Sequence, residues 1–228
     1  RYKKMSFVIV LATSKGGAGK TTLATCLAAY WHNVGMKVAI IDADPQGSII
    51  KSYNPDGPMG CIKVFSDPEV TISQTIKEKK SEFDLVIVDT GGFSNQTAAM
   101  AIVCSDIVLI PSKASALDIQ RAIETHGLIK DLNFTPERSG TPIVYRMVLT
   151  MTVQGTVISR QVKQDLKEMG YLLIDGELHN RVVYQEATLD GTPPNLLDQD
   201  SAAALDVAGI AREISSIRES LLDNRKVS

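Results

Sequence analysis

Short apolar runs rich in Val and Ile recur along this chain of 228 residues and constrain its fold more than any other feature. Their hydrophobicity is continuous rather than alternating, which is typical of strands buried on both faces. Such strands belong to a mostly parallel sheet that helices cover on both sides. The expected strands span residues 7–12, 37–42, 85–89, 107–111, 143–150 and 171–174.

Helical patterns separate these runs. The expected helices span residues 21–33, 95–104, 117–133, 159–169 and 200–223. Segments rich in Pro, Gly and Asp at residues 52–70 and 133–142 are expected to be loops within the domain. This alternation predicts an α/β fold with a doubly wound, mostly parallel sheet and helices on both faces, in a single domain over residues 1–228.

Composition narrows the classes of function. The formal net charge of −2 gives no strong overall field for nucleic acid, so any DNA contact needs a local basic patch. The cysteines form no Cys-x-x-Cys pair and are interpreted as reduced thiols of a cytoplasmic protein. Because we find neither a signal peptide nor an apolar run of about 18 residues, we expect a soluble, intracellular protein. Residues 1–4 precede Met5 and are expected to be a cloning remnant or an upstream extension.

A glycine-rich segment follows the first expected strand and leads directly into the first expected helix. In this setting, backbone N–H groups of the turn and of the helix N-terminus can surround phosphate oxygens. The Lys20 ammonium would neutralise β- and γ-phosphates, and the Thr21 hydroxyl would ligate Mg²⁺. The segment consists of Ser14, where the common pattern has Gly, and Lys15, Gly16, Gly17, Ala18, Gly19, Lys20, Thr21 and Thr22.

In two further motifs, aspartates stand at the end of an expected strand. Asp42 and Asp44 follow the second run, at the sheet edge where open α/β sheets bind ligands. Taken alone, such a pair is as often only a turn former. Asp89 follows four apolar residues, a Walker B pattern that would hold Mg²⁺. The presence of these two aspartate motifs disfavours the alternative that the glycine-rich turn binds no ligand.

Together the three motifs resemble the ParA/MinD group of deviant Walker ATPases, and the resemblance covers nearly the whole chain. The chain is most similar to the small, ParF-like ParA proteins of plasmid partition. Segments 105–111 and 181–191 add weaker similarity. Relatives commonly have prolines after the Walker B aspartate, whereas this chain has Thr90, Gly91 and Gly92, which leaves the geometry of this switch segment open.

The resemblance implies an ATPase with ATP and Mg²⁺ as ligands and a nucleotide-dependent sandwich homodimer. Lys15 would cross the dimer to the partner's nucleotide and neutralise charge on the transferred phosphoryl group. Asp44 would orient the attacking water, and Asp42 would support the Mg²⁺ and the phosphate loop. By position, Thr150 and Arg181 would contact the adenine.

The resemblance also implies a cycle on DNA. The ATP-bound dimer would bind DNA non-specifically on the nucleoid, and a ParB-like partner protein would stimulate hydrolysis and release it. A solvated helix face, balanced by Asp165 and Glu168, is an equally good interpretation of the basic residues that could serve as contacts. Those candidates are Arg160, Lys163, Lys167 and Arg181, with Arg212, Arg218 and Arg225 behind them.

Three alternatives stay open. The same switch could position another cargo, such as a chemotaxis cluster, a carboxysome or the transferred DNA strand of a conjugation system. A MinD-like membrane-cycling ATPase would need a bulky amphipathic C-terminal helix, for which residues 221–228 offer little. A metabolic or metal-cluster ATPase of the same fold either needs cluster cysteines, which are absent here, or has no need of Lys15.

Overall fold

The computed structural model describes residues 6–14, 16–92, 96–138 and 140–227. Residues 1–4, Lys15 and the first residue of the helix expected at 95–104 therefore lie outside the described residues. Within the described ranges, no helix is long and apolar enough to cross a membrane.

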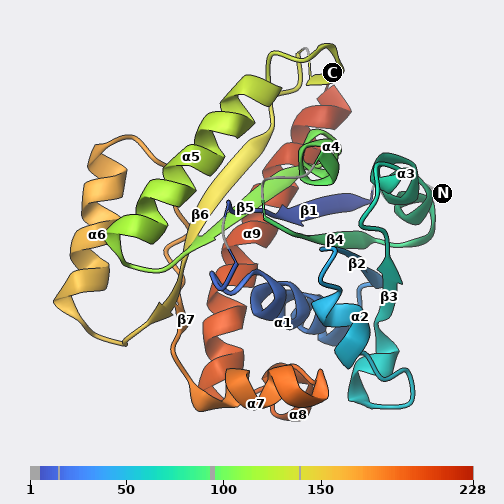
Figure 1. The fold of residues 1–228 in the computed structure, drawn as a ribbon, viewed down its shortest axis with the longest axis vertical. Coiled ribbons are helices and arrows are strands. Elements are labelled where there is room, and N and C mark those ends of the chain that lie inside the picture. Colours follow the sequence, from blue (N-terminus) through green and yellow to red (C-terminus); the bar gives the residue numbers. More distant parts are fainter. Residues whose placement is uncertain (1–5, 15, 93–95, 139, 228) are drawn as a thin grey trace.

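A seven-stranded sheet, counted over the described residues, forms the centre of the molecule in the order β3-β2-β4-β1-β5-β6-β7 (Figure 1). All of its strand pairs are parallel. The continuous apolar runs at β1, β2, β4 and β5 are buried along their full length, as the sequence predicts. The strands are β1 (Phe7–Leu11), β2 (Val38–Ala43), β3 (Lys63–Ser66), β4 (Leu85–Thr90), β5 (Ile107–Ser112), β6 (Val144–Thr152) and β7 (Leu178–His179).

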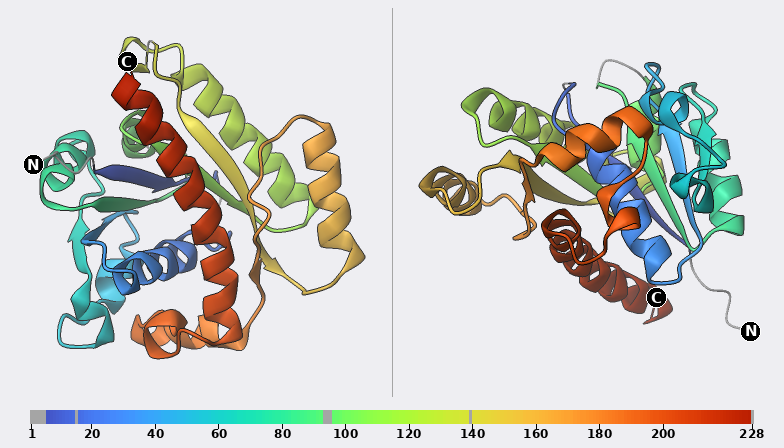
Figure 2. Two further views of the ribbon diagram at one scale, coloured as in Figure 1. Left: turned by 180° about the vertical axis from the view of Figure 1, so that it is seen from behind. Right: turned by 90° about the horizontal axis from the view of Figure 1, so that it is seen from below.

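Helices cover both faces of this sheet, which confirms the predicted doubly wound α/β fold (Figure 2). The α-helices are α1 (Lys20–Asn33), α2 (Ser48–Ser52), α3 (Ile72–Glu82), α4 (Gln96–Val103), α5 (Ala116–Leu132), α6 (Val157–Glu168), α7 (Val182–Asp190), α8 (Pro194–Leu197) and α9 (Ala202–Val227). Short 3-10 turns lie at Pro58–Cys61 and Pro136–Arg138.

Alternating side chains of β1 divide the core into two clusters. Phe7 and Ile9 face one cluster, which includes α1 and α9. Val8 and Val10 face the other cluster, which includes α3, α4 and α5. The first cluster fixes α1, the helix that the phosphate loop precedes, against α9.

The strand expected at residues 171–174 does not form. An isolated parallel bridge joins Leu173 to Met147 there, and the sheet resumes only at β7. The chain turns away because the next N–H groups bond a side chain instead of a strand: those of Asp175 and Gly176 donate to the Glu213 carboxylate over 2.8 and 2.7 Å.

The segment at residues 52–70 is more than the expected loop. It contains a 3-10 turn and the edge strand β3, which pairs with β2 on one side. The strand has only four residues, and the two at its ends are exposed. A short, half-exposed edge strand gives little apolar signal, which explains why the sequence pattern did not predict it.

Candidate nucleotide-binding site

The three sequence motifs converge at the carboxyl end of the sheet. In the strand register, Asp89 of β4 lies beside Leu11 of β1 on one side and Asp42 of β2 on the other. The glycine-rich segment follows β1, the strand at which the strand order reverses. Open α/β sheets bind ligands in the crevice at this point.

The phosphate loop owes its shape to glycines and to one threonine from a distant strand. Gly17 and Gly19 have φ values of 80° and 82°, in the left-handed region that glycine adopts readily. The buried Thr150 hydroxyl, at the end of β6, donates to the Ala18 carbonyl over 2.9 Å. Thr150 was expected to contact adenine, but in this structure its hydroxyl is engaged with the loop itself.

The Thr21 hydroxyl and the Asp89 carboxylate lie together next to the loop. The Thr21 hydroxyl donates to Asp89 Oδ2 over 2.6 Å. Asp89 is fully buried, and its Oδ1 has no hydrogen-bond partner among the described residues. Burial raises the pKa of Asp89 to about 7, although the Thr21 hydrogen bond and the charge of Lys20 oppose the shift.

This oxygen pair fits Mg²⁺. Mg²⁺ is commonly held by one or two carboxylates, with waters and phosphates as its other ligands. The orphaned Asp89 Oδ1 could be satisfied by such an ion or by one of its waters. In the described ranges no group of three or more His, Cys, Asp or Glu could hold a metal without other ligands.

Asp42 supports the neighbouring helix α2. Its Oδ2 accepts the N–H groups of Ile49 and Ile50, both over 3.0 Å, and its Oδ1 accepts that of Asp44 over 3.3 Å. Burial raises the pKa of Asp42, and these backbone bonds oppose the shift. Direct ligation of Mg²⁺ by Asp42, which the sequence suggested, would compete with these bonds and stays a prediction.

Lys20 begins α1 and is held among carboxylates. It is 6% exposed, and burial lowers its pKa while the charges of Asp89 and Asp44 oppose the shift. Asp44 is half-buried, and its Oδ1 accepts the N–H of Gln46 over 2.8 Å. A buried ammonium at a helix N-terminus, beside loop N–H groups, is suited to bind a polyphosphate.

A pocket of about 160 Å³ opens beside the loop, where the sequence placed the adenine. Met151 stands at a bulge of β6 with φ 54°, a left-handed conformation that is strained for a non-glycine residue; such strain clusters at functional sites. The sequence pattern did not predict this backbone conformation. It also did not predict that His179 and Tyr184 line the pocket. The lining residues are Gly19, Thr22, Met151, Leu178, His179, Asn180, Arg181, Tyr184 and Gln185.

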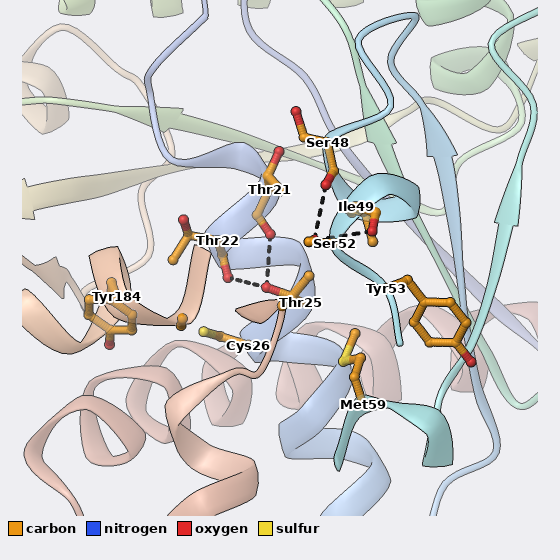
Figure 3. Close-up of a pocket in the computed structure, with 12 residues that line it drawn as sticks. Thr21, Thr22, Thr25, Cys26, Ser48, Ile49, Ser52, Tyr53, Met59 and Tyr184 are labelled. Atoms are coloured by element: carbon orange, nitrogen blue, oxygen red, sulfur yellow. Dashed lines mark hydrogen bonds between the residues drawn. The ribbon is translucent and has the colours of Figure 1, made fainter. Parts of the chain in front are cut away.

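A larger pocket of about 320 Å³ lies between α1, α2 and α7 and shares Thr22 and Tyr184 with the smaller one (Figure 3). Its lining includes Cys26, Ile49 and Met59, and is mostly apolar. The hydroxyls of Thr25 and Ser52 point along their own helices and donate to backbone carbonyls there. Thr21 and Thr22, at the start of α1, also line this pocket, so it adjoins the phosphate loop.

The four candidate DNA contacts differ in what they touch. Lys163 Nζ lies 2.6 Å from Glu177 Oε1, and Lys167 Nζ lies 2.6 Å from Asp175 Oδ1. Both lysines are thus neutralised within the chain. Arg160 is exposed and forms no ion pair with any residue the structure describes.

Arg181, the fourth candidate, was predicted to contact both adenine and DNA. It lines the smaller pocket, but its Nε and Nη2 donate to the Asp206 carboxylate over 2.7 and 3.0 Å. Behind it, Arg212 Nε donates to the Ala208 carbonyl over 3.1 Å, and the Arg218 guanidinium lies 5.8 Å from the Phe7 ring centroid. The side chain of Arg225 lies outside the described residues.

Comparisons with known proteins agree with this geometry. The model of the VirC1 protein family matches residues 5–191. Protein ParA of Rhizobium radiobacter is 33% identical over 181 residues, which cover 78% of this chain and 80% of that protein. Maintenance of carboxysome distribution protein A of Halothiobacillus neapolitanus is 26% identical over 194 residues, which cover 82% and 85% of the two chains.

Solved structures show the same fold. The septum site-determining protein MinD from Pyrococcus horikoshii, complexed with Mg-ADP, matches with a TM-score of 0.73 at 15% identity. The match covers 95% of this chain and 99% of that chain. At this identity the likeness concerns the fold alone.

Proposed function

We propose, from the fact that this chain belongs to the VirC1 family and to the wider ParA/MinD group of ATPases, that it is a DNA-segregation ATPase. In this proposal one cytoplasmic ATPase domain over residues 1–228 forms a homodimer around MgATP and binds DNA non-specifically on the nucleoid. A ParB-like partner then stimulates hydrolysis and releases the dimer. The observation that carries the ATPase part is the hydrogen bond from the Thr21 hydroxyl to the fully buried Asp89, next to the phosphate loop.

The residues of the loop divide the work of binding. The N–H groups of residues 16–22 surround the phosphates, and Lys20 neutralises their charge. Thr21 and Asp89 hold Mg²⁺, which when bound supplies positive charge against the phosphates. Met151, Asn180 and Arg181 enclose the base.

Hydrolysis needs two further groups. Asp44 accepts a hydrogen bond from the attacking water and so orients it. Lys15 of the partner subunit neutralises the charge that develops on the transferred phosphoryl group, which makes hydrolysis depend on the dimer. Asp42 takes part indirectly, because it holds the start of α2 next to the Asp44 turn.

Binding to random duplex DNA, with ATP, with ADP and without nucleotide over a salt series, tests this function. Lys15→Ala is the dimer-deficient control. We expect binding only with ATP, lost in the variant and weakened by salt, because non-specific binding rests on phosphate contacts. ATP-dependent dimerisation without DNA binding would contradict the segregation function and leave an ATPase that acts on another surface.

A second candidate is the positioning of a protein cargo along DNA. The relative named for maintenance of carboxysome distribution matches over 82% of this chain, and this name supports a cargo other than a DNA molecule. The two candidates share the DNA-binding step and differ in the activator. Hydrolysis stimulated by a centromere-bound protein supports segregation, and stimulation by a protein without DNA affinity supports the second candidate.

A further inference from the structure

The segment after β4 approaches the Asp44 turn so closely that a side chain at Gly91 would be crowded. The buried Thr90 hydroxyl donates to the Leu11 carbonyl over 2.8 Å, which fixes the end of β4 to the end of β1. Gly91 follows and is buried. A Cβ added at Gly91 would lie 3.2 Å from Pro45 Cδ and 3.3 Å from Asp44 Oδ1. Both distances are shorter than ordinary van der Waals contact.

The neighbouring glycine provides a contrast. A Cβ at Gly92 would meet its nearest atom, the Ser14 carbonyl oxygen, at 3.5 Å, which is an ordinary contact. The φ of Gly91 lies outside the left-handed region, so alanine could adopt its backbone conformation. Space against the Asp44 turn, rather than backbone freedom, is therefore the reason for a glycine at position 91.

We propose that Gly91 is a positioning residue that sets the place of the Asp44 carboxylate. This inference rests on the proposed function, in which Asp44 orients the attacking water. An alanine at position 91 would displace the Asp44 turn by a few tenths of an ångström, because the bond from Thr90 to Leu11 holds the end of β4 in place. Since a misplacement of about 1 Å can cost about 100-fold in rate, this smaller shift should cost about 3- to 10-fold.

Gly91→Ala and its matched control Gly92→Ala test the inference through steady-state ATP hydrolysis and ATP affinity. We expect Gly91→Ala to lower kcat about 3- to 10-fold while the Kd for ATP stays within about two-fold, because the phosphate loop is untouched. Gly92→Ala should lower kcat less than Gly91→Ala does, because its Cβ would meet only an ordinary contact. Equal kcat in the two variants, or a Kd that rises as much as kcat falls, would overturn the inference.

A double-mutant cycle separates this inference from the proposed function. If Gly91 acts through Asp44, then Gly91→Ala has no further effect in an Asp44→Ala background. Wild-type protein that hydrolyses no ATP contradicts the proposed function, and unchanged kcat in Asp44→Ala contradicts the role of Asp44; either result removes the inference too. Additive effects of the two changes overturn the inference alone.

Thermal unfolding of each variant checks that it folds. If Gly91→Ala does not fold, the comparison moves to a Pro45→Ala background, which lacks the nearest crowded atom, Pro45 Cδ. There, a lower kcat in Pro45→Ala/Gly91→Ala than in Pro45→Ala supports the inference through the remaining contact with Asp44. Equal kcat values overturn it.

Discussion

The N-terminus of α1 and the outer face of α6 both place lysines beside carboxylates, but the two regions are built differently. Lys20 is buried, and its neighbour Asp89 keeps one carboxylate oxygen without a hydrogen bond among the described residues. On α6, Lys163 and Lys167 each form a direct ion pair with a carboxylate from the following segment. The two regions therefore differ in burial: Lys20 is 6% exposed, whereas Lys167 and its partner Asp175 are both exposed.

The largest test of this contrast is Lys20→Ala. Loss of the buried ammonium leaves the β- and γ-phosphates without a point charge in a low-dielectric site, so we expect ATP hydrolysis to fall by about 100-fold or more. Hydrolysis assays and ATP titration measure the change. Lys51→Ala, an exposed lysine on α2, is the control and should behave as wild type. Similar losses in both variants would mean that Lys20 has no special role.

Asp89→Asn tests the metal side of the same region. The amide keeps an acceptor for the Thr21 hydroxyl but removes the negative charge that would hold Mg²⁺. We expect the Mg²⁺ concentration for half-maximal hydrolysis to rise about 10-fold or more. A Mg²⁺ titration that is unchanged in this variant would contradict the assignment of Asp89.

Thr150→Val asks whether the shape of the loop depends on the distant strand β6. The change keeps the side-chain volume but removes the hydrogen bond to the Ala18 carbonyl, which would be left buried without that donor. An unmade buried bond costs about 1–3 kcal/mol, part of which should appear as an ATP affinity about 5- to 10-fold weaker. Thr150→Ser, which restores the hydroxyl, should recover most of the affinity; equal weakening in both variants would point to packing instead.

The salt dependence of DNA binding tests whether the paired lysines of α6 contact DNA. Because Lys163 and Lys167 are paired within the chain, the double change to Ala should alter DNA affinity by about two-fold or less. Arg160→Ala should lower the slope of log K against log salt by about one phosphate contact. The reverse order of effects would mean that the lysines leave their carboxylates when DNA binds.

Acid stability offers the smallest expected effect. Burial raises the pKa of Glu177, but hydrogen bonds from Lys163 and Thr152 lower it by more, so the pKa of Glu177 lies below its ordinary value. The hydrogen bond from Lys167 lowers the pKa of Asp175. These ion pairs stabilise the folded state above the ordinary carboxyl pKa values, which are 3.8 for Asp175 and 4.5 for Glu177. This stabilisation is lost as the pH falls through the lowered pKa values of the folded protein. Acid unfolding of Lys163→Ala/Lys167→Ala should therefore begin at slightly higher pH than that of wild type. Identical acid unfolding curves would contradict this.

The phosphate loop and the central strands could be predicted from sequence because their signals are local. Continuous apolar runs predict buried parallel strands, and the segment from Ser14 to Thr22 needs only its own spacing to be identified. The acids at the ends of two runs then predict that Asp42 and Asp89 each follow a buried strand and serve the ligand site. The structure places them opposite each other in the strand register.

The remaining features depend on contacts between distant residues. The bond from Thr150 to Ala18 joins residues separated by 132 positions, and the pairing of Lys163 with Glu177 depends on how the chain turns away from β6. The basic spacing on α6 predicts a charged face correctly, but it says nothing about which carboxylates will meet it. The sequence is therefore least informative about which charged side chains form ion pairs on the surface.

The packing of α1 against α9 has a consequence for synthesis on the ribosome. Leu23 and Leu27 of α1 share a cluster with Ile210 and Ile214 of α9, and Trp31 Nε1 donates to Ser215 Oγ over 3.2 Å. A nascent chain emerges N-terminus first, so α1 leaves the exit tunnel long before its covering helix does. Until α9 emerges, the part of α1 that packs against it stays open to water and to chaperones. The residues of the phosphate loop are thus among the first to be made, whereas the packing of the helix that follows them is completed only late in translation.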